Sequence, residues 1–313
     1  MDAAGRESWH AVADAVLAAP GIVMMLGAAD VGKTTTATRL AATAVGAGLH
    51  TAVVDADIGQ SDIGPPATVG WGMVGTPVRH MAEIAPAGLW FVGDTSPQQM
   101  YRYVLQGTAE LTARARGRGA QVVVVDTTGW VEGAGAVAAK LRKIRRLAPR
   151  HIVAIQRDRE VEPILARIPD GTTVHRLRPA AAVRIRTAAE RRAFRRRQFA
   201  GYFAAAHRIS VDARRVAFAR PALFEGTWVP PSRVLANVPA AALRHLLVGL
   251  ADSRGTIMSV GTILRVDARL RRLLIMAADV APDAVRSVAW GMLRVAPSGR
   301  EEGRLSGMPA VAS

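Results

Sequence analysis

The chain has 313 residues, half of them hydrophobic by a broad count, and it contains no cysteine. This length and apolar content provide for one large domain or two ordinary domains with a buried core. The lack of cysteine excludes disulfides, thiolate metal ligands and a cysteine nucleophile. No run of about 18 uncharged apolar residues occurs, so we expect no membrane span, and the mixed N-terminal segment does not read as a secretory signal. We therefore expect a cytoplasmic protein.

The formal net charge of +16 favours an anionic partner such as nucleic acid. The cations, however, are 38 arginines and only three lysines, a bias that GC-rich coding also produces. Charge is therefore informative only where it clusters, at residues 140–150 and 184–197. A solvated helix face is the alternative interpretation of both clusters.

In chain order, apolar segments of strand length alternate with helical stretches through the first two thirds of the sequence. The expected strands are 21–26, 51–56, 88–93, 121–126, 151–156 and 172–177, and the expected helices are 33–48, 98–117, 135–147, 159–167 and 188–206. Several of the strand segments are apolar on both faces. This pattern predicts an α/β fold with a mostly parallel sheet flanked by helices.

The pattern changes after about residue 210, where short apolar segments are separated by turn signals such as residues 252–255. We expect a first domain over 1–209 and a small, mainly β C-terminal domain over 210–313. The segment from about residue 298 lacks periodicity and is expected to be a loose tail.

Residues 27–34 carry the pattern G-x-x-x-x-G-K-T directly between an expected strand and an expected helix, which is the context that makes a P-loop specific. Backbone N–H groups of such a loop surround phosphate oxygens, while the lysine reaches the outer phosphates and the threonine hydroxyl ligates Mg²⁺. The expected nucleotide-binding residues are Gly27, Ala28, Ala29, Asp30, Val31, Gly32, Lys33, Thr34 and Thr35. A P-loop predicts nucleotide binding but does not identify the reaction.

Two carboxylates stand at the carboxyl end of the next expected strand, where ligands bind in open α/β sheets. Asp55 and Asp57 are two positions apart and share one side if the strand continues through both. One carboxylate near Mg²⁺ and one base for the attacking hydroxyl are needed in phosphoryl transfer. The alternative is that one of the two merely supports the turn before Gly59.

Five further segments place the chain beside a known family. The stretch DADIGQSDIGPPATVG at 55–70, with the P-loop, FVGDTSPQQ at 91–99, VVVDTTGWVEGAGAVAAKL at 123–141, HIVAIQRDREVEPIL at 151–165 and the arginine segment at 184–197, resembles the polynucleotide 5′-hydroxyl kinases. That family includes the RNA kinase of the pre-mRNA cleavage machinery and the ribosomal-RNA-processing kinase. The resemblance covers about residues 20–207 and is to the compact prokaryotic form.

This resemblance implies a P-loop NTPase-type fold and a kinase that uses ATP and Mg²⁺. The implied acceptor is the free 5′-hydroxyl of RNA, with DNA left open as a further acceptor. Lys33 and Thr34 would hold the triphosphate, and Asp57 would activate the hydroxyl and support the metal. Asp55 is the weaker candidate, and Gln60 is expected to shape the acceptor site.

The resemblance also implies a clasp at 126–130 that holds the end of the acceptor strand. Trp130 would stack on a base, and Thr127 and Thr128 would donate hydrogen bonds to phosphate oxygens. A half-buried core tryptophan is the alternative for Trp130. Asp126 stands where many relatives have asparagine, which leaves open whether it helps to hold Mg²⁺ through water.

The arginine segment has a capping-box pattern at 187–190, which predicts a helix that begins near Ala188. Arg186, Arg191 and Arg195 match the basic positions of the family lid, with Thr187 in place of serine. Lid arginines over 184–207 would stabilise charge on the transferred phosphoryl group.

Two other classes of function are compatible with a P-loop. One is a nucleotide-gated RNA-binding scaffold with little turnover, and the other is a P-loop GTPase or ATPase switch. No N/T-K-x-D element for guanine recognition is present, and the sequence has no cysteine ligands for metal delivery. The five histidines outside the first 50 residues show no metal-ligand spacing, and we assign them to structure. The oligomeric state has no signal in the sequence.

Overall fold

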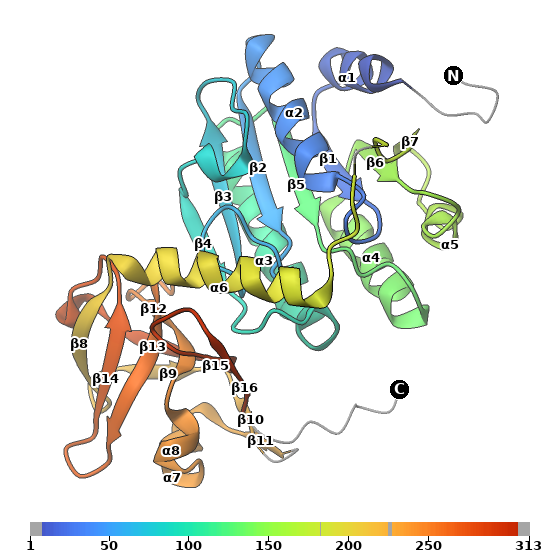
Figure 1. Cartoon of the computed structure of the whole chain (residues 1–313). Helices are drawn as coiled ribbons and strands as arrows, with labels where there is room; N and C mark the ends of the chain where they lie inside the picture. The colour runs from blue at the N-terminus through green and yellow to red at the C-terminus, as the bar shows by residue number, and fades with distance from the viewer. Residues whose placement is uncertain (1–7, 182, 225–226, 306–313) are drawn as a thin grey trace. The chain divides into compact units, whose positions relative to one another are not determined.

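The computed structural model describes residues 8–181, 183–224 and 227–305, which form two compact units (Figure 1). The first unit comprises residues up to Gly64, Val69–Gly88 and Ser96–Ala188. The second comprises Pro65–Thr68, Leu89–Thr95 and the chain from Ala189 onward. The contacts thus divide the chain about twenty residues before the expected boundary at 209/210. The reason is that Phe199 and Phe203, on the helix before that boundary, are buried in a core cluster of the second unit.

The first unit contains a mostly parallel sheet, as predicted. Its strands are β1 (Ile22–Leu26), β2 (Thr51–Ala56), β3 (Thr68–Val74), β5 (Val122–Thr127), β6 (His151–Ile155) and β7 (Thr173–Leu177), in the spatial order β3-β2-β5-β1-β6-β7. All neighbours in this order are parallel except β3, which runs antiparallel to β2. The carboxyl ends of β1, β2 and β5 therefore lie at the same edge of the sheet, and each is followed by one of the expected functional segments.

Helices cover both faces of this sheet. They are α1 (Trp9–Ala18), α2 (Lys33–Gly46), α3 (Pro97–Gly117), α4 (Ala134–Leu147) and α5 (Glu162–Leu165), with a short 3₁₀ turn at Met81–Glu83. Val23, Val53 and Val124 pack with α1 and α2, and the buried residues between them on each strand face the opposite side. Burial on both faces explains why β1, β2, β5 and β6 are largely apolar, whereas the edge strand β7 is only partly buried and carries polar residues. No helix in the described ranges is both long and apolar enough to cross a membrane.

The second unit is mainly β, as predicted. It contains α6 (Ala188–Ala204, which begins at the expected residue), β4 (Gly88–Phe91), β8 (His207–Asp212), β9 (Ala217–Ala219), β10 (Ala222–Phe224), β11 (Thr227–Val229), β12 (Leu246–Ala251), β13 (Ile257–Asp267), β14 (Arg272–Ala277), β15 (Ser287–Val295) and β16 (Glu301–Arg304). Short helical turns lie at Pro231–Arg233, α7 (Val234–Asn237), α8 (Ala240–Leu243) and Pro282–Ala284. Antiparallel pairing runs β16-β15-β12-β13-β14-β8 around a core that includes Ile263, Ile275 and Trp290.

The expected loose tail from about residue 298 is wrong for its first part. Residues 301–304 form β16, which pairs antiparallel with β15. This strand has no apolar alternation, and polar contacts hold it instead. Ion pairs join Glu301 to Arg195 and Arg304 to Asp94, and a hydrogen bond joins Glu302 to His245. The remainder of the expected tail, from residue 306, lies outside the described residues.

We expect Arg304→Met to destabilise the protein by about 2 kcal/mol. Asp94 is fully buried and accepts two hydrogen bonds from the Arg304 guanidinium, at 2.8 and 2.9 Å. Loss of one partner from a buried pair costs about 3–5 kcal/mol, and the 39% exposure of the Arg304 side chain reduces that figure. Urea unfolding measures the change. Arg300→Met is the matched control because its side chain is 67% exposed, and an equal loss in both variants would contradict the prediction.

Candidate active site

The loop between β1 and α2 has the conformation of a phosphate-binding loop. A Cβ on Gly27 would lie 2.4 Å from the carbonyl oxygen of Ile155, and Gly32 has φ +89°, so both positions need glycine. Helix α2 begins at Lys33, whose Nζ donates a hydrogen bond to the carbonyl oxygen of Ala28 at 2.7 Å. The ammonium group therefore lies over the loop that precedes its own helix, where anions are favoured by the helix terminus.

A cavity of about 420 Å³ adjoins this loop. Its lining comprises Trp9, Val31, Gly32, Thr35, Thr36, Arg39, Ile155, Leu177, Arg178, Ala180 and Val183. The Arg39 guanidinium lies over the Trp9 ring, 4.5 Å from its centroid. The volume and the mixed apolar and cationic lining suit the nucleoside part of a nucleotide whose phosphates lie in the loop.

Two buried carboxylates are neighbours in register at the carboxyl ends of β2 and β5. Asp55 pairs with Asp126 across the parallel ladder, and both side chains are 1% exposed. The Thr34 hydroxyl donates a hydrogen bond to Asp126 Oδ2 at 2.6 Å. Burial raises the pKa of Asp126 to about 6, with the Lys33 ammonium opposing the rise and the Asp57 charge adding to it. Asp126 is thus the carboxylate that contacts the P-loop threonine.

Asp55 holds the loop that follows β2. Its Oδ2 accepts hydrogen bonds from the Ser61 hydroxyl at 3.1 Å and from the N–H groups of Asp62 at 2.7 Å and Ile63 at 3.1 Å. Its Oδ1 accepts from the N–H of Asp57 at 3.1 Å. Burial raises the pKa of Asp55 well above its usual range, and the nearby Asp126 charge adds to the rise. Of the two acids in the sequence pattern, Asp55 is therefore the one whose hydrogen bonds support the loop after β2.

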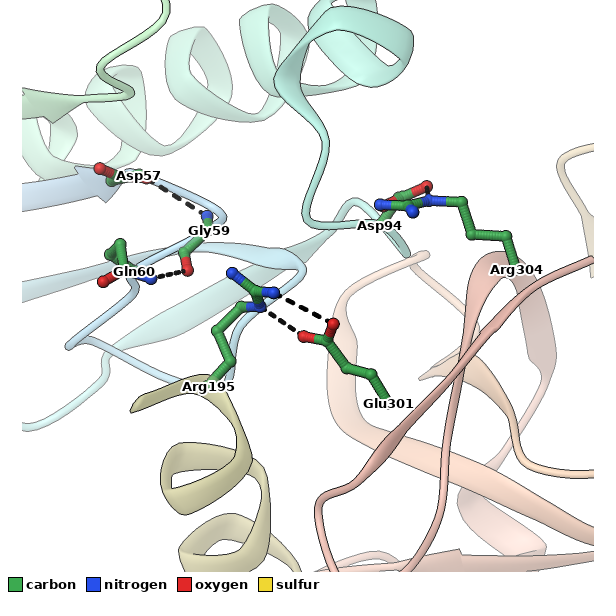
Figure 2. A network of polar contacts seen from close by, with 7 residues as sticks. All are labelled: Asp57, Gly59, Gln60, Asp94, Arg195, Glu301 and Arg304. Carbon is green, nitrogen blue, oxygen red and sulfur yellow. Dashed lines mark hydrogen bonds and ion pairs between the residues drawn. The ribbon is translucent and has the colours of Figure 1, made fainter. Parts of the chain in front are cut away.

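Asp57 lies just beyond β2, which ends at Ala56, so the two acids do not share a strand face. Its carboxylate is half-buried and accepts a hydrogen bond from the N–H of Gly59 at 3.2 Å (Figure 2). Gln60 Nε2 donates to the carbonyl oxygen of Gly59 at 2.6 Å, while Gln60 Oε1 is buried with no hydrogen-bond partner among the described residues. An unpaired buried carbonyl is costly, so Gln60 Oε1 is an acceptor available to a ligand.

The segment 126–130 turns back against the P-loop. A Cβ on Gly129 would lie 2.4 Å from the backbone nitrogen of Ala29, so only glycine allows this approach. Trp130 is half-buried, and Thr128 is buried close to it. Thr127 does not fit its expected role as a phosphate donor, because its side chain is fully buried and its hydroxyl donates to the carbonyl oxygen of Met25 at 2.8 Å. Alternation along β5 explains this, since Asp126 and Thr127 face opposite sides of the sheet.

The expected lid arginines fall in different units. Arg186 belongs to the first unit, where its Nε donates to Asp30 Oδ1 of the P-loop at 2.8 Å and its N–H donates to Asp30 Oδ2 at 3.1 Å. Arg191 and Arg195 lie on α6 in the second unit, where Arg195 makes a two-point ion pair with Glu301 (Figure 2). The structure therefore brings Arg186 to the P-loop, and the role of the other two arginines stays a prediction.

Thr34 and Asp126 are the side chains that fit a magnesium ion. Within the described ranges, no group of three or more His, Asp or Glu residues could hold a metal. Mg²⁺ bound with phosphates needs only one or two oxygen ligands from the protein, which a hydroxyl and a carboxylate 2.6 Å apart supply.

Comparison with known proteins identifies the family. Residues 27–205 match the model of the mRNA cleavage and polyadenylation factor CLP1 P-loop. This chain belongs to the CLP1 P-loop family. It is similar to the polyribonucleotide 5′-hydroxyl-kinase of Pyrococcus furiosus, with 29% identity over 91% of both chains, and to that of Methanocaldococcus jannaschii, with 26% identity over 90% of this chain and 89% of the relative. A solved complex of Clp1p with Pcf11p has the same fold, with a TM-score of 0.72 at 13% identity over 91% of this chain and 78% of that one.

The CLP1 P-loop family match covers the P-loop, the loop after β2, the 126–130 segment and α6. Sequence reasoning missed two parts of the site in this range. One is the cavity lining from β7 and the segment that follows it, which has no motif. The other is the burial of two lysines on α4, Lys140 and Lys143, which the sequence places only within the basic cluster 140–150, so a solvated helix face is wrong for these two residues. The signal for these lysines was the rarity of lysine in an arginine-rich chain.

Asp55→Ala should destabilise this member of the CLP1 P-loop family by about 3 kcal/mol, because it removes the acceptor of four hydrogen bonds and leaves buried N–H groups unpaired. Urea unfolding measures the loss, and amide exchange at Asp62 and Ile63 localises it. Asp14→Ala, an exposed acid on α1, is the control and should change stability by less than about 0.5 kcal/mol. Unchanged exchange at residues 62 and 63 would contradict the assignment of Asp55 as the support of this loop.

Proposed function

We propose that this protein is a kinase that transfers the γ-phosphate of ATP to the free 5′-hydroxyl of RNA. The observation that carries the proposal is the convergence of three segments at one sheet edge: the P-loop with Lys33 and Thr34, the turn with Asp57, and the turn with Trp130. Membership of the CLP1 P-loop family and similarity to polyribonucleotide 5′-hydroxyl-kinases over 91% of the chain support it.

The P-loop residues bind the donor. Backbone N–H groups of residues 27–32 and the Lys33 ammonium surround the β- and γ-phosphates, and the cavity beside Trp9 holds the nucleoside. Arg186, which contacts Asp30 of the P-loop, is placed to neutralise charge on the transferred group. Little covalent chemistry is required of these residues, because phosphoryl transfer depends mainly on position and charge.

Asp57 accepts the proton of the attacking hydroxyl. Its carboxylate has one hydrogen bond, from Gly59, and no ion pair with any described residue, so one oxygen is available to the 5′-hydroxyl. Gln60 Oε1 provides an acceptor close by in the same loop, and Trp130 provides a ring face for the terminal base. Thr128 is the remaining candidate for a hydroxyl contact with the acceptor strand.

We assign the magnesium site to Thr34 and Asp126 and not to Asp57. Thr34 and Asp126 would hold the ion, which would neutralise charge on the phosphate oxygens. The Thr34 hydroxyl donates its proton to Asp126 Oδ2, which turns its lone pairs outward. We place RNA ahead of DNA as the acceptor because the archaeal relatives named above are polyribonucleotide kinases.

The direct test is transfer of label from γ-labelled ATP. With Mg²⁺ present, a 5′-hydroxyl RNA oligonucleotide should acquire label, whereas the same oligonucleotide with a 5′-phosphate should not. A DNA oligonucleotide of the same sequence measures the preference for the 2′-hydroxyl. ATP consumption without labelled RNA would favour a nucleotide-driven switch, and RNA binding with neither reaction would favour a scaffold.

A further inference from the structure

The three lysines of the chain are gathered and buried in the first unit. Lys33, Lys140 and Lys143 are 5%, 3% and 6% exposed, although the chain uses arginine at 38 other positions. A coding bias toward arginine gives no reason for the lysines to gather. An ammonium group is compact and fits a buried space that a planar guanidinium does not. Lys140 and Lys143 are three residues apart on α4 and so lie on the same helix face.

Lys140 has its hydrogen bonds within the protein. Its Nζ donates to Thr127 Oγ1 at 2.9 Å, to the carbonyl oxygen of Thr128 at 2.6 Å and to Thr128 Oγ1 at 3.4 Å. These bonds fix the turn that precedes Trp130. Lys140 is therefore a positioning residue for that turn and is not available to a ligand.

Lys143 has no hydrogen bond or ion pair with any residue in the described part of the chain. With Tyr101, Thr128 and Trp130 it lines a cavity of about 20 Å³, which has room for one oxygen-sized group. The Lys143 side chain is buried apart from the part that lines this cavity, and desolvation of an ammonium group without a counter-ion is costly. Burial lowers the pKa of Lys143 to about 8, and the charges of Asp57 and then Asp126 oppose that fall. An anionic oxygen in the cavity would complete the hydrogen bonding of this group.

We propose that Lys143 binds a non-bridging oxygen of the phosphodiester that joins the first two nucleotides of the acceptor strand. The proposal rests on the proposed function, which supplies the acceptor. Three observations favour the acceptor over the nucleotide donor as the source of this phosphate. First, Lys143 lines the same cavity as Trp130. Second, the negative charge that most favours the protonated form of Lys143 is that of Asp57. Third, the neighbouring Lys140 faces the side of the sheet opposite the contact between Asp126 and Thr34. The 5′-hydroxyl and the first phosphodiester belong to the same nucleotide, so one site holds both.

The test pairs a protein change with an acceptor change. Fluorescence anisotropy measures the Kd of full-length protein for three 5′-hydroxyl RNAs: all-phosphate, methylphosphonate at the first linkage, and methylphosphonate at the third linkage. In wild type, the first-linkage change should raise Kd about 30-fold, as expected for loss of a charge-assisted hydrogen bond, and the third-linkage change by less than about threefold. Lys143→Met should raise the Kd for the all-phosphate RNA by a similar factor. In this variant, methylphosphonate at the first linkage should then raise the Kd by less than about a further threefold.

Arg146→Met is the matched control, because it removes one positive charge from an exposed position of α4 and should keep the full first-linkage loss. Lys143→Met replaces a buried charge by an apolar chain of similar length, and thermal unfolding should show no decrease in stability. Lys143→Gln serves as a second variant for the same comparison. The KM for ATP should be unchanged in both variants.

Retention of the full first-linkage loss in Lys143→Met and Lys143→Gln would overturn the proposal. So would a rise in the KM for ATP without a change in RNA affinity, which would make Lys143 part of the donor site. If the effect of the first-linkage change on Kd depends on Lys143 but no label is transferred to RNA, the phosphate site is supported and the kinase activity is rejected. If label is transferred but the effect of the first-linkage change on Kd does not depend on Lys143, the kinase activity is supported and the Lys143 phosphate site is rejected.

Discussion

Replacement of Asp57 by asparagine should lower the kcat of RNA phosphorylation about 10³-fold, the middle of the range for loss of a general base. The amide has the same shape and can still accept the hydrogen bond that the Gly59 N–H donates at 3.2 Å, so the loop should keep its conformation. It cannot take the proton of the 5′-hydroxyl. Steady-state kinetics with 5′-hydroxyl RNA and saturating ATP measure the change.

Binding of ATP with Mg²⁺ should stay within about threefold of wild type in Asp57→Asn, because the carboxylate that contacts Thr34 is Asp126. Asp62→Asn is the matched control: it removes the same charge from the same loop and should change kcat by less than about threefold. A large fall in nucleotide affinity in Asp57→Asn would return Asp57 to the metal site. Equal loss of kcat in Asp57→Asn and Asp62→Asn would show that loop charge, and not proton transfer, matters.

Much of the fold of the first unit could be predicted from the sequence because both sheet faces are buried. Six segments read as strands, most of them from apolar runs, and five of these are β1, β2, β5, β6 and β7 within about one residue at each end. The strand missed was β3 (Thr68–Val74), whose sequence TVGWGMV contains two glycines. At Gly70 and Gly72 an added Cβ would lie 1.9 Å and 2.4 Å from backbone oxygens of Ile63 and Ala85, so these glycines allow close chain packing that no strand pattern encodes.

The candidate site could be predicted where a motif fixes the backbone and could not where a side-chain direction decides. The P-loop pattern identified its residues because glycine at 27 and 32 is required by contact and by φ. The acids were harder. Because β2 ends at Ala56, the Asp57 side chain does not share a strand face with Asp55. The pleat of β5 directs Asp126 to Thr34 and Thr127 to Lys140. Those directions depend on where a strand stops, which sequence patterns locate only within a few residues.

The second unit shows a different limit. Its strands β12, β13 and β14 follow from short apolar segments in the sequence, but β16 is held by ion pairs to residues far away in the sequence. Arg195 and Glu301 are 106 positions apart, and Arg304 and Asp94 are 210 apart. Only the folded chain brings these charges together, so a charged segment such as 300–304 resembles a solvated tail.

Replacement of Asp126 by alanine should weaken the binding of Mn²⁺ in the presence of a non-hydrolysable ATP analogue by about 30-fold. Mutation of the groups that orient metal ligands commonly costs about 10–100-fold in metal affinity. The Thr34 hydroxyl donates to Asp126 Oδ2 at 2.6 Å, and without this acceptor the hydroxyl is free to turn its lone pairs away from the ion. Electron paramagnetic resonance of free Mn²⁺ measures the affinity without requiring turnover.

Asp126→Asn separates the hydrogen bond from the charge. Asparagine Oδ1 can accept the same hydrogen bond from Thr34. The neutral amide also avoids the cost of burying a negative charge, which is the cost that raises the pKa of Asp126 to about 6. We therefore expect Mn²⁺ affinity within about threefold of wild type in Asp126→Asn, with the 30-fold loss confined to Asp126→Ala. Equal losses in the two variants would mean that the carboxylate charge holds the ion. No loss in Asp126→Ala, with thermal unfolding unchanged, would exclude Asp126 from the metal site and leave Thr34 as the remaining proposed ligand.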